Sequence, residues 1–320
     1  LCKSFGPINN LVIEDIPDLT PDKDEVVINV KACGLNFPDT LIVQGKYQFK
    51  PEFPFSPGGE ISGIVKEIGV DVKHLNVGDK VMYGSVFSGF AEEVKAKAKD
   101  VFKMPPTMDF TTAASSMLTY GTSYHALVNR ANLLSDETLL VLGAAGGVGT
   151  AAIQIGKALG ATVIAAASTD EKLEFCKENG ADFTINYSTE VLKNRVKELT
   201  NGKGANVIYD PVGDKFSEPA LRAIAWKGRY LVIGFAAGEI PKIPLNLVLL
   251  KGCQIVGVFW GAFFKNEPQQ YIKNFEIIVK WFAQGKLKAR IHGEYPLENV
   301  VEAMRTMINK EVKGKIVLIP

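Results

Sequence analysis

The pattern of hydrophobic positions is clearest in the middle of the chain. Between residues 137 and 259, short apolar runs rich in β-branched residues alternate with segments that carry apolar residues at helical spacing. Short, continuous apolar runs are typical of strands buried on both faces of a parallel sheet. Strand–helix alternation of this kind predicts a doubly wound α/β domain. The predicted strands are Thr138–Gly143, Thr162–Ala167, Asn206–Tyr209, Arg229–Ile233 and Gln254–Phe259.

The two flanks of this region have a different pattern. The first 115 residues contain short strand candidates separated by turn-forming residues, and helical spacing is sparse there. We predict a mostly antiparallel, partly barrel-like domain over residues 1–117 and the parallel-sheet domain over residues 118–261. Residues 262–320 are expected to return to the first domain, through predicted helices at 269–284 and 297–309 and strands at 292–295 and 315–319.

Composition limits the classes of partner. The chain has 320 residues, 47% of them hydrophobic, and a formal net charge of +1, so charge gives no reason to expect nucleic acid or a membrane as a partner. The four cysteines and three histidines are scattered, which disfavours a disulfide scaffold and a local zinc cluster. No apolar run reaches transmembrane length. We expect a soluble cytoplasmic protein; removal of a targeting segment would instead place it in an organelle.

The candidate chemistry begins with the glycine-rich loop Gly143-Ala-Ala-Gly-Gly-Val-Gly149. It joins a predicted strand to a predicted helix. Small residues allow a tight turn and a close approach of the backbone to a pyrophosphate, while the helix N-terminus offers free N–H groups to the phosphates. A structural turn without a ligand is the alternative. In a series of strand–helix units, we favour a dinucleotide in a Rossmann-type domain.

The type of dinucleotide depends on the end of the second strand of that domain. NAD sites usually place an acid there to bind the ribose hydroxyls, but this chain has Ser168. The small hydroxyl leaves room for a 2′-phosphate, which Lys172 and Tyr187 are suited to bind. Asp170 argues for NAD, although it also fits the first turn of a helix, and Ser168 and Glu171 have capping-box spacing. We predict NADPH.

Several motifs together identify a resemblance. The chain resembles the zinc-free quinone oxidoreductase branch, also called ζ-crystallin-like, of the medium-chain dehydrogenase/reductase superfamily. The resemblance covers nearly the whole length and implies that the first domain is a GroES-like catalytic domain. The matching motifs are Gly34–Asp39, Gly45–Tyr47, Pro54–Glu60, Val77–Asp79, Gly143–Gly149, Asn186–Tyr187 and Gly314–Ile319.

The resemblance implies metal-free chemistry. Zinc-dependent relatives carry a cysteine where this chain has Asn36 and a histidine where it has Gly59, and neither replacement supplies a zinc thiolate or imidazole. Without a Lewis acid, the implied activity is transfer of a hydride from NADPH to an electron-poor quinone or α,β-unsaturated carbonyl.

The resemblance also implies site residues. Asn36 is expected beside the nicotinamide ribose and the substrate, although an asparagine there also suits a turn. Thr122 is expected near the nicotinamide but also fits as an ordinary helix hydroxyl. Lys310 stands where a relative has arginine, so the point charge of an ammonium replaces the planar fork of a guanidinium. The predicted cofactor-binding residues are Asn36, Thr122, Gly146, Gly147, Val148, Ser168, Lys172, Tyr187, Gly234, Phe235, Phe259, Trp260, Gly261 and Lys310. For the aromatic residues among them, core packing is an equally good explanation.

Asn36 and Tyr47 are the predicted catalytic residues, and both are expected to orient the substrate oxygen. Related enoyl-thioester reductases use a tyrosine at the matching place to protonate carbon, but here Gln48 follows it where those relatives often have proline. Tyr47 is either a proton donor or a wall of the substrate cleft, and only an enone or enoyl substrate needs the donor.

Two rival functions remain open. An enoyl-CoA or acryloyl-CoA reductase predicts cations for the CoA phosphates, for which Lys46, Lys50 and Lys265 are candidates. A non-catalytic NADPH-binding, crystallin-like or RNA-binding protein predicts tight cofactor binding without turnover. In either case we expect a homodimer that pairs the apolar edge strand 254–259 of two chains, as the family does.

Overall fold

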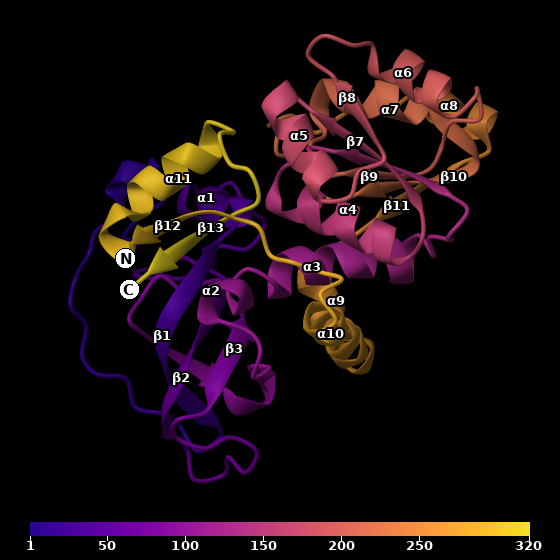
Figure 1. Ribbon diagram of the computed structural model, residues 1–320. Coiled ribbons are helices and arrows are strands. Elements are labelled where there is room, and N and C mark those ends of the chain that lie inside the picture. Colours follow the sequence, from indigo (N-terminus) through magenta and orange to yellow (C-terminus); the bar gives the residue numbers. More distant parts are fainter. The chain divides into compact units, whose positions relative to one another are not determined.

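The computed structural model describes all 320 residues, and the chain divides into two compact units (Figure 1). Unit 1 comprises Leu1–Leu118 and Ala289–Pro320, and unit 2 comprises Thr119–Lys288. The second crossing between units falls at residue 289, whereas the sequence predicted a return from residue 262. The reason is that two residues of this late segment are buried in the core of unit 2. They are Ile278 of the helix over residues 268–283 and Leu287 in the turn that follows this helix.

Unit 1 is built on a seven-stranded sheet in which only one pair of strands is parallel, which confirms the predicted mostly antiparallel domain. The strand order is β12-β13-β1-β2-β3-β5, with β4 also paired to β1. The strands are β1 (Glu25–Leu35), β2 (Glu60–Ile68), β3 (Lys80–Gly84), β4 (Glu93–Lys97), β5 (Val101–Lys103), β12 (Ile291–Pro296) and β13 (Lys315–Ile319). The helices are α1 (Phe37–Val43), α2 (Phe110–Ala113) and α11 (Val300–Ile308).

The late segment of the chain completes this sheet. β13 pairs antiparallel with β1, through Cys33 opposite Leu318, and parallel with β12. The last strand of the chain is therefore part of the sheet of unit 1. Strand β1 is buried along almost its whole length, because β2, β4 and β13 pair with it and the apolar core covers it.

Unit 2 is a six-stranded parallel sheet in the order β11-β10-β9-β6-β7-β8, which confirms the predicted doubly wound domain. The strands are β6 (Thr138–Leu142), β7 (Thr162–Ala167), β8 (Phe183–Asn186), β9 (Ala205–Asp210), β10 (Ile224–Val232) and β11 (Gln254–Gly257). The helices are α4 (Gly147–Ala158), α5 (Asp170–Glu178), α6 (Leu192–Leu199), α7 (Ser217–Arg222), α8 (Leu245–Lys251), α9 (Trp260–Asn266) and α10 (Pro268–Ala283). Helix α3 (Met117–Tyr124) contains the division between units.

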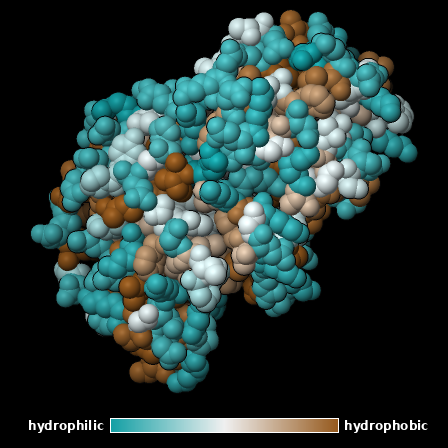
Figure 2. Space-filling model, in the orientation of Figure 1, coloured by the Kyte–Doolittle hydropathy of each residue, from teal (hydrophilic) through white to brown (hydrophobic).

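Alternate residues of the unit 2 strands enter two separate cores. Leu139 and Val141 of β6 pack with residues of α4 and α10, whereas Leu140 and Leu142 pack with residues of α6, α7 and α8. Both faces of the sheet are thus covered by helices, which explains why the strands are continuous apolar runs. The exposed surface is mainly hydrophilic in the view of Figure 2, with apolar residues in small groups. None of the helices combines the length and apolar character needed to cross a bilayer.

Candidate functional site

The glycine loop of unit 2 follows β6 and forms the N-terminus of α4. Gly143 has a φ of +57°, a conformation that L-residues with side chains rarely adopt. A Cβ atom on Gly149 would lie 2.5 Å from the Gly143 carbonyl oxygen and 2.8 Å from the Ala144 Cα, so only glycine fits between helix and strand. Gly146 precedes the helix, and no side chain caps the first turn of α4. The backbone amides at this end therefore have the geometry that binds phosphate in dinucleotide-binding proteins.

The loop lies at the point where the strand order of unit 2 reverses. From β6 the chain proceeds to β7 and β8 on one side, and β9 pairs with β6 on the other side. Ligands of doubly wound sheets bind in the crevice at the carboxyl ends of the two strands that flank this reversal. Gly146, Gly147 and Val148 are all partly exposed there. The topology thus supports the same ligand position as the glycine spacing.

Asp210 fixes the turn after β9 on the other side of the reversal. Its buried carboxylate accepts hydrogen bonds from the backbone N–H of Val212 at 2.8 Å and of Gly213 at 2.9 Å, from the Ser217 hydroxyl at 2.9 Å, and from the Tyr230 hydroxyl. Burial and the Asp210 charge raise the pKa of Tyr230 far above its usual value, which keeps that donor protonated. Asp210 was not predicted as a site residue, because nothing near it in the chain marks it as functional. Its role here is to hold the backbone of the turn.

The predicted 2′-phosphate residues surround the end of β7. Burial raises the pKa of the Tyr187 hydroxyl, while the Ser168 side chain lowers it. Lys172 lies in the first turn of α5 and is half-buried. The Asp170 carboxylate accepts a hydrogen bond from the Asn186 side chain at 2.8 Å. Asp170, the residue that favoured NAD in the sequence, is thus engaged within the protein.

The cap of α5 differs from the sequence expectation. Thr169 is the N-cap, and its hydroxyl accepts a hydrogen bond from the Lys172 backbone N–H at 3.3 Å. The capping-box pair of Ser168 and Glu171 was therefore predicted one residue too early. The consequence is that the Ser168 side chain is not used as a cap.

The remaining predicted cofactor residues of unit 2 lie after β10 and β11 and on α3. Phe259 is 54% exposed, whereas Thr122 on α3 is buried. Trp260 packs against Phe264 and Tyr271, with ring centroids 5.8 and 5.9 Å apart. Gly234 is partly buried, Phe235 is exposed at 36%, and Gly261 follows Trp260 in the first turn of α9.

The Trp260 ring also explains a glycine that sequence analysis missed. A Cβ atom on Gly121 of α3 would lie 2.7 Å from the indole Nε1. That Nε1 is buried without a hydrogen-bond partner. The absence of a side chain at Gly121 thus leaves space for the indole ring of Trp260 beside α3.

In unit 1, Asn36 belongs to a buried polar network between β1 and α1. Its Nδ2 donates to Glu60 Oε2 at 3.1 Å and to the Gly34 carbonyl oxygen at 3.2 Å. Its Oδ1 accepts from Lys315 Nζ at 2.7 Å. Lys315 also donates to Glu60 Oε2 and to the Leu35 carbonyl oxygen, each at 3.1 Å. Neither Glu60 nor Lys315 was predicted as a site residue. The only signal for Lys315 was a charge at the first position of the otherwise apolar strand β13, and Glu60 begins β2, which contains other polar residues.

Asp39 and Tyr47 lie beside this network. The Asp39 carboxylate accepts from the Asn36 backbone N–H at 2.7 Å, and burial raises the pKa of Asp39 to about 7, while the Lys315 charge lowers it. Burial and the negative charge of Asp39 raise the pKa of the Tyr47 hydroxyl. Tyr47 is therefore protonated at neutral pH and able to donate a hydrogen bond or a proton. Tyr47 also packs against the core of unit 1, and this packing is equally compatible with a role as a wall of the substrate cleft.

The two positions that replace zinc ligands do not fit a zinc ion. A Cβ atom on Gly59 would lie 2.7 Å from the Ser85 carbonyl oxygen, so no ligating side chain fits there without a shift of the backbone. The Asn36 amide oxygen already accepts a hydrogen bond from the Lys315 ammonium, and the positive charge of Lys315 would repel a zinc ion bound to the same oxygen. No group of three or more His, Cys, Asp or Glu side chains is arranged to hold a metal ion.

Four further lysines predicted to contact phosphates are distributed over both units. Lys310 lies in unit 1, in the turn after α11, with a φ of +62°. Lys46 and Lys50 belong to unit 1 and Lys265 to unit 2, and all three are exposed. Lys46 Nζ donates to the Gln44 side chain at 2.8 Å. The predicted contacts of these lysines with phosphates remain predictions.

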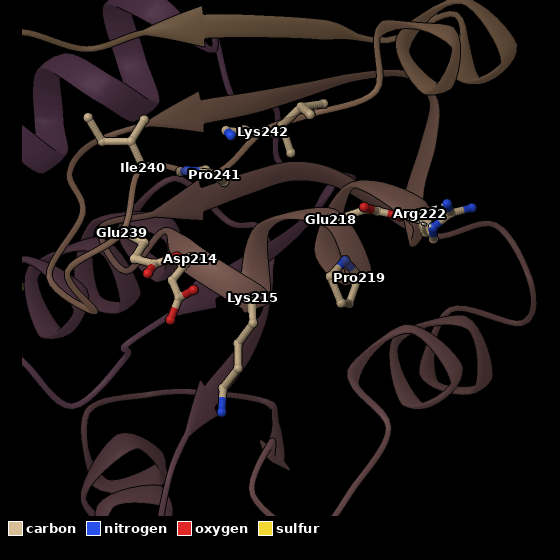
Figure 3. Close-up of a pocket in the computed structure, with 10 residues that line it drawn as sticks. Asp214, Lys215, Glu218, Pro219, Arg222, Glu239, Ile240, Pro241 and Lys242 are labelled. Carbon is tan, nitrogen blue, oxygen red and sulfur yellow. Dashed lines mark hydrogen bonds and ion pairs between the residues drawn. The ribbon is translucent and has the colours of Figure 1, made fainter.

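Unit 2 also contains a charged groove of about 530 Å³ that the sequence did not indicate. Figure 3 shows it between the start of α7 and the loop of residues 239–243, with Glu218 close to Arg222. The Glu218–Arg222 pair is an ion pair with an N–O distance of 2.6 Å. None of the predicted cofactor residues lines this groove. A smaller, mostly apolar hollow of about 180 Å³ lies beside it and includes Phe235.

Comparison with known proteins defines the class first. Residues 22–106 match the alcohol dehydrogenase GroES-like domain, and residues 147–277 match the zinc-binding dehydrogenase family. A GroES-like domain joined to a parallel dinucleotide-binding sheet is the architecture of the medium-chain dehydrogenases and reductases.

Individual relatives define the family. The chain is 40% identical to a quinone oxidoreductase-like protein 2 homolog of Nematostella vectensis, over 99% of this chain and 87% of that protein. It is 33% identical to human quinone oxidoreductase, over 98% of this chain and 94% of that protein. It superposes on Escherichia coli quinone oxidoreductase complexed with NADPH with a TM-score of 0.93 and 28% identity, over 99% and 98% of the two chains. The chain belongs to the quinone oxidoreductase family of medium-chain oxidoreductases, and the predicted resemblance is confirmed.

Proposed function

We propose that the chain is an NADPH-dependent, zinc-independent reductase of quinones or α,β-unsaturated carbonyls. The observation that carries the proposal is the uncapped, glycine-built N-terminus of α4, which lies at the reversal of the strand order. Its partly exposed amides suit a pyrophosphate. The family supports the reaction class, because named relatives are quinone oxidoreductases and one of them is known with NADPH.

The environment of Ser168 supports NADPH rather than NADH. Ser168, Lys172 and Tyr187 offer a hydroxyl, an ammonium and a phenol near the end of β7, and Asp170 is held by Asn186. These donors suit a 2′-phosphate, whereas a free carboxylate would repel it. We propose Lys310 as a further point-charge contact. Contacts of Thr122, Gly234, Phe235, Phe259, Trp260 and Gly261 with the nicotinamide end are also proposals.

The residues of unit 1 supply proton chemistry. When bound, NADPH supplies the hydride, and reduction of a quinone or an alkene then requires a proton as well. The Tyr47 hydroxyl is kept protonated by its raised pKa and is proposed to donate to the substrate oxygen or carbon. Asn36 is proposed to contact the cofactor ribose. No zinc is required, because the positions of Asn36 and Gly59 do not fit one.

A turnover assay tests this proposal. Purified protein is mixed with NADPH and with separate panels of naphthoquinones, enones and enoyl thioesters, and the absorbance of the reduced cofactor is followed. We expect consumption of NADPH with quinones or enones, unchanged by a zinc chelator. Absence of turnover on every panel would defeat the reductase. Tight NADPH binding without any turnover would favour the non-catalytic, crystallin-like alternative.

An enoyl-CoA or acryloyl-CoA reductase is the second candidate. The observation that favours it is the protonated Tyr47 beside the buried Asp39, because an enoyl substrate gains most from a proton donor. Exposed Lys46, Lys50 and Lys265 are candidates for contacts with the CoA phosphates. A catalytic efficiency at least tenfold higher for enoyl-CoA than for the matching simple enone would select this candidate.

We propose a homodimer formed through the free edge of the unit 2 sheet. β11 pairs only with β10, and apolar side chains near this edge are exposed, including Trp226 at 69%, Leu249 at 79% and Ile255 at 40%. An unpaired apolar edge favours strand pairing with a second copy. Sedimentation velocity should give a dimer at micromolar concentration, and Ile255→Lys should shift it to monomer. A monomeric wild-type protein would refute this assembly.

We propose that the protein acts in the cytoplasm on a small molecule, without nucleic acid or membrane partners. The formal net charge of +1 gives no electrostatic reason for either partner. Microscopy of the full-length protein with a fluorescent tag tests the compartment. Fluorescence confined to an organelle would refute the cytoplasmic location.

A further inference from the structure

Two charged residues of the buried network around Asn36, Glu60 and Lys315, have no role in the function proposed above. The network consists of Asn36 at 5% exposure, Glu60 at 0% and Lys315 at 4%. The three residues come from the end of β1, the start of β2 and the start of β13. Such charges cost free energy when they are removed from water, so each must be well partnered.

The hydrogen bonds of Lys315 and Glu60 are mutually consistent. The three N–H bonds of the Lys315 ammonium have three acceptors, which are Glu60 Oε2, Asn36 Oδ1 and the Leu35 carbonyl oxygen. Glu60 Oε1 accepts from the Leu118 backbone N–H at 2.9 Å. Glu60 is thereby anchored at one oxygen and faces Lys315 and Asn36 with the other.

Gly34 makes the network possible. A Cβ atom at this position would lie 2.0 Å from the Ala114 carbonyl oxygen, 3.0 Å from Glu60 Oε2 and 3.1 Å from Lys315 Nζ. Any side chain would therefore displace the charged groups. The absence of a side chain at Gly34 is a requirement of this network.

The network fixes which way the Asn36 amide faces. Lys315 can only donate and Glu60, when ionised, can only accept, so the amide oxygen must face Lys315 and the amide nitrogen must face Glu60. Both N–H bonds of Nδ2 are used, by Glu60 and by the Gly34 carbonyl oxygen. One lone pair of Oδ1 remains. Asn36 is therefore ready to accept one more hydrogen bond and has no proton left to donate.

We propose that Lys315 and Glu60 are positioning residues that hold Asn36 as a hydrogen-bond acceptor for a hydroxyl of the cofactor's nicotinamide ribose. This inference rests on the proposed function. It changes the role of Asn36, because an acceptor cannot orient a quinone or enone oxygen, which itself needs a donor.

Glu60→Gln is the sharpest variant, because it changes one oxygen to an NH₂ group at constant shape. If the remaining oxygen still accepts from Leu118, the new NH₂ group faces two donors, Asn36 Nδ2 and Lys315 Nζ. Rotating the Asn36 amide would relieve one conflict and create another with Lys315. The orientation of Asn36 is then no longer fixed. We expect the Kd for NADPH to rise about tenfold, the effect of one lost hydrogen bond.

The readout compares two ligands by titration calorimetry. NADPH contains the nicotinamide ribose, whereas adenosine 2′,5′-bisphosphate lacks it and reports binding to the adenosine end alone. We expect Glu60→Gln to weaken NADPH and to leave the Kd for the bisphosphate within about twofold. Equal weakening of both ligands would indicate a general structural defect and overturn the inference.

Glu25→Gln is the matched control. Glu25 is also a buried glutamate of unit 1, at the opposite end of β1, where it pairs with Lys95 at 3.1 Å and Lys97 at 3.2 Å. It loses the same charge, yet should leave both dissociation constants unchanged. If it reproduces the NADPH-specific loss, Glu60 has no special role.

A double-mutant cycle tests whether Glu60 acts through Asn36. In an Asn36→Ala background, Glu60→Gln should add less than twofold to the Kd for NADPH, because the group it orients is already absent. An additive effect would overturn the inference. If Glu60→Gln does not fold, Lys315→Met removes the donor to Oδ1 and must give the same ligand-specific loss. A wild-type protein that does not bind NADPH refutes the proposed function itself, whereas wild-type binding with an unaffected Glu60→Gln variant refutes only this inference.

Discussion

The two units build their candidate ligand contacts from different materials. Unit 2 relies on backbone amides at the start of α4, where Gly143 and Gly149 create the turn and no side chain caps the helix. Unit 1 relies on buried side chains, Asn36, Glu60 and Lys315, which satisfy one another's hydrogen bonds. A site of backbone amides is encoded in seven adjacent residues, whereas a side-chain network depends on residues far apart in the chain.

Gly149→Val should break the backbone-built site. A Cβ atom there meets the Gly143 carbonyl oxygen at 2.5 Å, and valine adds two methyl groups to this contact. We expect a loss of roughly 3 kcal/mol or more in the free energy of unfolding, together with loss of NADPH binding. Denaturant unfolding and cofactor titration measure the two effects. Gly146→Ala is the control, because the nearest atom to its Cβ is 3.5 Å away, so it should weaken NADPH while changing stability by less than about 1 kcal/mol. Equal stability losses in the two variants would contradict the contrast.

Tyr47→Phe should show whether unit 1 supplies a proton. Removal of the hydroxyl should lower kcat/KM for enones roughly a hundredfold and for quinones less than threefold, because only the alkene requires protonation at carbon. Steady-state kinetics with both substrate classes measure the ratio. Tyr83→Phe, which removes a hydroxyl from another partly buried tyrosine of unit 1, should change neither. Equal losses with both substrates would leave Tyr47 as a wall of the cleft.

Asp39→Asn should change how stability depends on pH. Burial raises the pKa of Asp39 from 3.8 to about 7, so the folded state holds this proton more tightly than the unfolded chain does. Its contribution to stability is therefore complete below pH 4 and is lost as the pH rises towards 7. Since asparagine does not titrate, the variant should gain on the wild type by at most about 1.4 kcal/mol per pH unit between pH 5 and 7, with no further gain above pH 7.

Urea unfolding at several pH values measures this dependence. Asp24→Asn is the control, because the Lys97 side chain lowers the pKa of the exposed Asp24 and its titration falls below this pH range. The Asp24 variant should therefore show a constant difference from the wild type between pH 5 and 8. A constant difference for Asp39→Asn as well would rule out a buried proton at that carboxyl.

Lys172→Ala tests the part of unit 2 that depends on side chains. Loss of one charged contact to a 2′-phosphate should raise the KM for NADPH about tenfold and leave the KM for NADH nearly unchanged. Lys177→Ala on the same helix α5, where Lys177 pairs with Glu174 at 2.6 Å, should affect neither cofactor. A similar rise in the KM values for NADH and NADPH would show that Lys172 does not recognise the 2′-phosphate.

The sequence predicted the regular parts of unit 2 well, because local rules govern them. β7 begins and ends where the apolar run Thr162–Ala167 does, and the glycine loop lies between β6 and α4 as expected. β8, over Phe183–Asn186, was missed because two of its four residues, Thr184 and Asn186, are polar and interrupt the apolar run. The cap of α5 moved from Ser168 to Thr169, a one-residue shift that side-chain spacing alone cannot resolve.

The site of unit 1 was much less accessible to sequence analysis. Asn36 and Tyr47 were singled out through the family resemblance, but their partners were not. Lys315 lies 279 residues after Asn36 and 255 after Glu60. Only the pairing of β13 with β1 brings these residues together, and a single sequence contains no signal for that register. A buried charge at the start of an apolar strand was the available hint.

The position of β13 also determines the order in which the chain is able to fold during synthesis. Unit 2 is a continuous segment, complete once residue 288 has left the ribosome. β13 lies between β12 and β1, so β1 lacks that neighbour until residue 319 has emerged. The first strand made thus waits for the last one, while the parallel-sheet unit is free to fold between them. Until then the buried Glu60 has no ammonium partner, and unit 1 cannot reach its final structure before translation of the strand that carries Lys315.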